Sequence, residues 1–145
     1  MKNLIHGITL LLIISVTGTV YADTHISKSP KDVRVYFLEP ADGQVVSGDI
    51  IVKFGLSGMA VAPAGTDTEN SGHHHLLIDV DDDQLPDMTQ PLPASDTVVH
   101  FGKGQTETQL NLSPGKHTLQ LLLGDHMHVP HEAPVISDKI TITVE

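Results

Sequence analysis

The chain has 145 residues, of which 39% are hydrophobic and only 3% aromatic, with ten His, no Cys and no Trp. Its length fits one domain. The 18 Asp and Glu against 8 Lys and Arg give a formal net charge of −10 at pH 7 with His neutral. This charge argues against nucleic acid or an anionic membrane surface as a partner, because both are polyanions. The absence of Cys excludes thiol catalysis, disulfides, cysteine zinc fingers and lipid attachment to a thiol.

Residues 1–22 have the pattern of a secretory signal peptide. Lys2 precedes an apolar run over residues 8–16, and Ala22 ends a small-residue cleavage site. The polar residues 17–19 cut this run short of the about 20 apolar residues that a membrane-spanning helix needs. We therefore expect cleavage after Ala22, a periplasmic or secreted mature protein, and no membrane anchor once the signal peptide is removed.

The rest of the chain predicts an all-β protein. Residues 23–32 contain Pro30 and are typical of a loose N-terminal arm, and residues 33–145 are expected to form a single domain. Seven β-rich runs separated by turn residues are predicted strands: 33–38, 49–56, 73–80, 97–101, 107–112, 117–123 and 139–144. Strands of this number and length favour an immunoglobulin-like antiparallel sandwich, without the Cys and Trp residues of antibody domains.

The predicted strand over residues 73–80 has two different faces. Successive strand side chains point to opposite sides, so His74 shares a face with the apolar residues at every second position from Leu76 to Val80. We expect that face in the core. His73 and His75 then lie together on the other face, about 7 Å apart along the strand, as candidate metal ligands. The same alternation predicts as core residues Leu76, Ile78, Val80, Leu119, Leu121, Leu123, Ile140 and Ile142.

A second group of histidines follows the predicted strand over residues 117–123. His126, His128 and His131 lie close together with the thioether of Met127, and His100 stands at another strand end. Imidazole suits copper, zinc, iron and nickel, and a thioether favours Cu(I) among them. The candidate metal ligands are therefore His73, His75, His100, His126, His128 and His131, with copper as the preferred metal and zinc second.

Four segments occur in an order that resembles a known family: GHHHLLID (72–79), HFGKGQTE (100–107), PGKHTLQL (114–121) and HVPHxxPVxS (128–137). Together they look like the bacterial domain of unknown function family 4399, small exported proteins, over roughly residues 59–144. The resemblance implies no particular activity. The family-like histidines are His73, His74, His75, His100, His117, His128 and His131. His126 and Met127 lie outside this pattern, and His117, before an apolar strand, is expected to be a hydrogen-bonded structural residue.

Three hypotheses of function remain open. The first is a periplasmic, His-rich metal-binding protein that carries or buffers copper. The second is a non-enzymatic module that binds an envelope protein and uses its histidines structurally or as pH sensors, because imidazole titrates near pH 6.5. The third is an enzyme in the style of the copper–zinc dismutases, for which no carboxylate-bridged zinc motif stands out. The choice depends on whether the strand over 73–80 meets the loop over 126–131.

Overall fold

The computed structural model describes residues 26–145, so the predicted signal peptide lies outside the described residues. Within them lie nine strands: β1 (Arg34–Glu39), β2 (Val45–Val46), β3 (Ile50–Ser57), β4 (Ala60–Val61), β5 (Ser71–Ile78), β6 (Val98–His100), β7 (Glu107–Leu110), β8 (Gly115–Gly124) and β9 (Ile140–Val144). A single 3₁₀ turn, η1 (Asp82–Gln84), is the only helical element in this range. Residues 26–145 therefore contain no helix that is long and apolar enough to cross a membrane.

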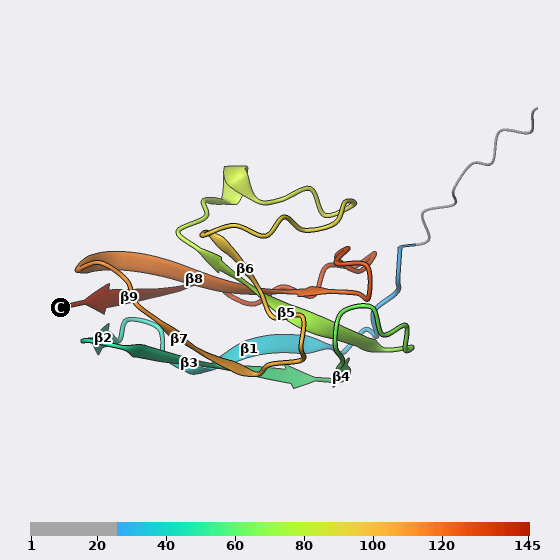
Figure 1. Ribbon diagram of the computed structural model, residues 1–145, viewed down its shortest axis with the longest axis horizontal. Coiled ribbons are helices and arrows are strands. Elements are labelled where there is room, and N and C mark those ends of the chain that lie inside the picture. The colour runs from blue at the N-terminus through green and yellow to red at the C-terminus, as the bar shows by residue number, and fades with distance from the viewer. Residues whose placement is uncertain (1–25) are drawn as a thin grey trace, which may run out of the picture.

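The strands form two sheets that lie one above the other (Figure 1). The smaller sheet has the order β1-β3-β7 and is antiparallel throughout. The larger has the order β2-β9-β8-β5-β4, with β6 also paired to β5. Only the two-residue strands β2 and β4, which the sequence did not predict, run parallel to their neighbours. The predicted all-β antiparallel sandwich is confirmed.

The main core fills the space between the two sheets. Alternate side chains of each strand point into it, such as Val52 and Phe54 from β3 and Leu119 and Leu121 from β8. Burying one large aliphatic side chain stabilises the fold by about 1.5–3 kcal/mol, so these rows decide which face of each strand turns inward. All the predicted core residues are buried: Leu76, Ile78, Val80, Leu119, Leu121, Leu123, Ile140 and Ile142.

The outer face of the larger sheet is covered too, by the loop over residues 79–97 that contains η1 (Figure 1). Leu77 of β5 and Leu122 of β8 point outward and pack with Leu92 of this loop in a second cluster. Val80 joins this second cluster and not the main core, where the alternation predicts it. The reason is that Asp79 has a left-handed φ of 54°, which ends the alternation of β5. Every residue of β5 is therefore buried, on both faces.

Candidate metal centre

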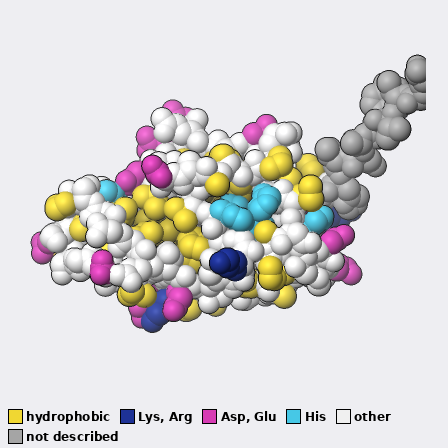
Figure 2. Space-filling view, in the orientation of Figure 1, with side chains coloured by type: hydrophobic (Ala, Val, Ile, Leu, Met, Phe, Trp, Pro, Cys, Tyr) yellow, Lys and Arg dark blue, Asp and Glu magenta, His cyan; other side chains and the backbone are white. Residues whose placement is uncertain are grey.

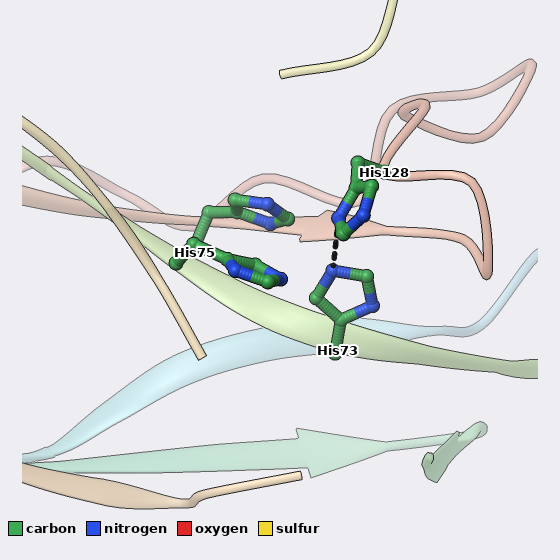
Figure 3. A group of neighbouring side chains, drawn as sticks. His73, His75 and His128 are labelled. Carbon is green, nitrogen blue, oxygen red and sulfur yellow. Dashed lines mark hydrogen bonds between the residues drawn. The ribbon is translucent and has the colours of Figure 1, made fainter. Parts of the chain in front are cut away.

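Four histidines from three parts of the fold converge on the outer face of the larger sheet. His73 and His75 come from β5, His100 ends β6, and His128 lies on the turn after β8. One ring nitrogen of each lies within 4.8 Å of the others. In Figure 3 the rings of His73, His75 and His128 point toward one another. We call these four residues the four-histidine centre.

One pair in the centre already has the spacing of metal ligands. Nε2 of His73 lies 3.1 Å from Nδ1 of His128 (Figure 3). Zinc–nitrogen bonds of about 2.0–2.1 Å in a tetrahedron place two ligand atoms about 3.3 Å apart. The ring nitrogens of the four histidines are separated by up to 4.8 Å, which is more than this ligand-to-ligand distance. A small inward movement of the remaining rings would therefore complete the coordination of one ion.

Strand pairing places three of the four rings. His73 and His75 share a face because they are two residues apart in β5. On one side of β5, the antiparallel strand β6 sets His100 directly opposite His75. On the other side, β8 sets Gly124 opposite His73. The pairing of β5 with β6 thus brings three imidazoles together. The pairing of β5 with β8 places the end of β8 next to His73.

A hydrogen-bonded turn over residues 125–129 places the fourth ring. Oδ1 of Asp125 accepts hydrogen bonds from the backbone N–H of Met127 at 2.8 Å and of Val129 at 3.0 Å. The backbone N–H of His128 donates to the carbonyl oxygen of Asp125 at 2.9 Å. His128 itself has a left-handed φ of 67°. This turn folds the chain back so that the His128 ring reaches His73.

Two glycines leave room for the rings. A Cβ on Gly124 would lie 2.8 Å from Cε1 of His75, and a Cβ on Gly102 would overlap the ring of His100. Any side chain at these positions would push a ligand out of place. The two glycines are therefore part of the construction of the centre.

Apart from the hydrogen bond between Nε2 of His73 and Nδ1 of His128, several ring nitrogens of the centre lack hydrogen-bond partners. His73 and His75 are only 0% and 1% exposed, while His100 and His128 are partly exposed. Among the described residues, nothing pairs with Nδ1 of His73, with either ring nitrogen of His75 or with Nε2 of His100. A buried polar atom without a partner costs about 1–3 kcal/mol. Figure 2 shows histidine side chains at the surface near the middle of one face. Because His100 and His128 are partly exposed, an ion could reach the centre from solvent.

Burial favours the neutral form of His73, His75 and His100. Burial first, and then repulsion between the rings, lowers the pKa of His73 to about 4 and of His75 to about 3. The carboxylate of Asp125 partly offsets this effect on the pKa of His73. The pKa of His100 is also lowered, first by burial and then by His128. Neutral imidazole is the form that binds a metal ion, so the lowered pKa values of these three histidines favour metal binding at pH 7.

Comparison with known proteins identifies the family. Residues 52–145 match the family described as Domain of unknown function (DUF4399). The chain belongs to the DUF4399 family. No curated protein has a sequence that matches it. Among solved structures it is similar to an endo-beta-1,4-mannanase from Thermotoga petrophila, with a TM-score of 0.47 and 17% identity. That similarity covers 79% of this chain and 20% of the mannanase chain, so the DUF4399 protein spans about a fifth of that enzyme's length.

In this DUF4399 protein the structure does not bring all six predicted ligands together. His126 is outside the four-histidine centre, with Nδ1 3.6 Å from Oδ1 of Asp67. His131 is also outside it, only 2% exposed and with Nδ1 unpaired. Both line a separate cavity of about 900 Å³. Met127, the thioether on the same turn as His128, is 58% exposed. The centre thus consists of imidazoles.

Two further histidines have structural surroundings. His74 points into the main core, where its ring centroid lies 5.1 Å from that of Phe54. His117 faces acceptors at both ring nitrogens: Nδ1 donates to Oδ2 of Asp79 at 2.7 Å, and Nε2 donates to the carbonyl oxygen of Ser113 at 2.8 Å. The prediction of a hydrogen-bonded structural His117 is confirmed.

The residues that hold the ligands in place are not among those predicted from the sequence. Asp125 fixes the turn, and Gly102 and Gly124 give the rings space. A signal for Asp125 exists in the sequence, because Asp directly after an apolar strand commonly bonds its own backbone two residues on. For the glycines the sequence offers only their position one or two residues from a ligand or strand end.

Proposed function

We propose that this DUF4399 protein is an exported metal-binding protein that carries or buffers copper, with zinc as the second metal. The ion would be held by His73, His75, His100 and His128. The observation that supports the proposal is the convergence of four imidazoles, three of which have buried ring nitrogens without a hydrogen-bond partner. A metal ion would use those lone pairs and so relieve the cost of burying them.

The donor set favours copper over zinc. Imidazole nitrogen suits both metals, and Cu(II) is held more tightly than any other divalent ion of the first transition row. His100 and His128 remain partly exposed, so the ion is not sealed inside the protein. An accessible centre suits a carrier or buffer, which must take up its metal and release it again.

Calorimetric titration with Cu(II), Zn(II) and, under reducing conditions, Cu(I) tests the proposal. Wild-type protein should bind one ion, with Cu(II) tighter than Zn(II). His75→Ala and His128→Ala should weaken binding by orders of magnitude, because each removes a ligand. His126→Ala is the matched control, two residues from His128 on the same turn, and should bind like wild type.

The outcomes separate the hypotheses. Wild-type protein that binds none of the three ions would contradict the proposal and favour a non-enzymatic module that binds an envelope protein. Tighter binding of Zn(II) than of Cu(II) would overturn the choice of copper. An equal loss of metal affinity in His126→Ala and His128→Ala would show that the metal binds outside the four-histidine centre.

The exported location needs a separate test. The pattern over residues 1–22 supports cleavage after Ala22. Mass spectrometry of the protein from a bacterial periplasm or medium should find Asp23 at the N-terminus. Protein that still begins at Met1 would contradict export by a cleaved signal peptide.

A further inference from the structure

Asp125 is a buried carboxylate beside the four-histidine centre without a cationic partner. It is 3% exposed and is the only buried Asp or Glu among residues 26–145. The ion pairs found in that range involve other acids, none of them Asp125. Burying a charge without a partner is costly, and proteins normally pair such a charge or place it near a metal ion.

The fold sets Asp125 next to the ligands. It directly follows Gly124, which lies opposite His73 in the β5–β8 ladder, and its carbonyl oxygen accepts the hydrogen bond from the N–H of His128. Its carboxylate accepts three hydrogen bonds, from the N–H groups of Met127 and Val129 and from Oγ of Ser27 at 2.7 Å. Three donors directed at both oxygens suit the ionised carboxylate, which only accepts.

Four neutral imidazoles bring no negative charge to an ion that they bind. An ion in the centre would therefore keep its full charge in a partly dehydrated place. A fixed negative charge nearby stabilises a divalent ion about twice as much as a monovalent one, because the Coulomb energy is proportional to the ion's charge. The buried carboxylate of Asp125 is close enough to the centre to raise the pKa of His73.

On the basis of the proposed metal-binding function, we infer that Asp125 is the counter-charge of the four-histidine centre and makes it selective for divalent ions, Cu(II) or Zn(II), over Cu(I). Asp125 acts through its charge and through the turn that positions His128, and it is not itself a ligand. The placement of Met127 agrees with this selectivity, since the thioether that would favour Cu(I) is 58% exposed and outside the centre.

The chain offers variants that separate charge from shape. In Asp125→Asn the side-chain oxygen can still accept from Met127 and Val129, and the new NH₂ can donate to Oγ of Ser27, so only the charge is lost. Ser27→Ala removes one hydrogen bond to Asp125 and keeps the charge. Ser27→Lys removes the same hydrogen bond, keeps the backbone hydrogen bonds of the turn to Asp125 and adds a cation beside its carboxylate. Thermal unfolding of each metal-free variant reports whether it folds.

The experiment measures the Kd for Zn(II), Cu(II) and Cu(I) in wild type and these variants, and the Cu(II)/Cu(I) potential. Asp125→Asn and Ser27→Lys should weaken Zn(II) and Cu(II) binding by about 10- to 100-fold, the usual effect of losing a partner behind the ligands. Cu(I) binding should change much less. Each tenfold weakening of Cu(II) binding relative to Cu(I) binding raises the Cu(II)/Cu(I) potential of the bound copper by about 59 mV. Ser27→Ala should leave the preference between the ions unchanged.

Equal weakening of all three ions in Asp125→Asn would mean that Asp125 acts only by shaping the turn, and unchanged binding would mean that it has no role; either result overturns the inference. If Asp125→Asn does not fold, Ser27→Lys compared with Ser27→Ala decides in the same way. Wild-type protein that binds no ion would instead refute the proposed function. The two failures are therefore distinguishable.

Discussion

The role of each histidine in this protein depends on what faces its two ring nitrogens. His117 has an acceptor at both nitrogens, which suits the protonated ring. His74 and His75 have no partner at either nitrogen and are fully buried, which suits the neutral ring. The sequence predicts the structural role of His117 from its place before an apolar strand. It does not reveal that Asp79, far away in the chain, would be its partner.

His117 should make the stability depend on pH. The hydrogen bond to Asp79 and then the bond to the Ser113 carbonyl raise the pKa of His117 above its usual 6.5. Its contribution is therefore fully present below about pH 6.5 and is lost as pH rises through the folded-state pKa. In the presence of a chelator, His117→Gln should lower the free energy of unfolding by about 1 kcal/mol more at pH 6 than at pH 9, since Asp79 is half-exposed and partly screened. Urea unfolding at both values measures this; an equal loss at both would show that the ion pair contributes nothing.

Replacing His74 should stabilise the protein. Its two unpaired nitrogens lie in the main core beside Phe54, and an apolar side chain of similar volume removes their cost without opening a cavity. His74→Leu should raise the free energy of unfolding at pH 7 by about 1 kcal/mol. Metal affinity should stay the same, because the His74 ring points away from the centre. Reduced stability in urea unfolding would show that His74 has a hydrogen-bond partner in solution.

At the scale of single elements, regular strands are predictable from the sequence and the turn after β8 is not. Strand periodicity alone puts His73 and His75 on one face and His74 on the other, and the structure agrees. The histidines after β8 have no such periodicity. The left-handed conformation of His128 and the hydrogen bonds to Asp125 decide which ring reaches the centre. Residue types alone cannot distinguish His128 from its neighbours.

A methyl group at the end of β8 should disturb the centre. In Gly124→Ala the new Cβ would meet Cε1 of His75 at 2.8 Å, so this ligand must move. We expect metal affinity to fall about tenfold or more. Gly55→Ala is the matched control, because its Cβ would meet the ring of Tyr36 on the other sheet. Titration of Zn(II) into both folded variants compares them, and equal affinities would show that the His75 ring has room to spare.

At the scale of the whole molecule, the three consecutive histidines of β5 connect metal binding to folding. The larger sheet buries all of them, although the sequence predicts only one face of this strand in the core. The second covered face comes from the loop over residues 79–97, whose acidic and Pro-rich composition resembles that of a solvated loop. Folding therefore moves three imidazoles out of water, and the neutral state of each is required in the native protein.

Without metal, the protein should unfold in mild acid. Burial lowers the pKa of His73 and His74 to about 4 and that of His75 to about 3, below the value of about 6.5 in the unfolded chain. The unfolded state then binds more protons, so stability is full above about pH 6.5 and falls as pH decreases toward 4. At pH 5 each histidine costs roughly 2 kcal/mol, and the three together approach the 5–15 kcal/mol by which a typical domain is stable.

Bound metal should protect the protein from this acid unfolding. An ion that binds only the native state adds about 4 kcal/mol at a concentration of 1,000 times Kd. Acid titration followed by far-UV circular dichroism should therefore give a midpoint at lower pH with excess Zn(II) than with a chelator. His74→Leu should also lower the chelator midpoint, because it removes one of the three buried imidazoles, while His126→Ala should not. A midpoint that is the same with Zn(II) and with chelator would contradict metal binding by the native centre. A midpoint unmoved by His74→Leu would show that the buried histidines of β5 do not set the acid stability.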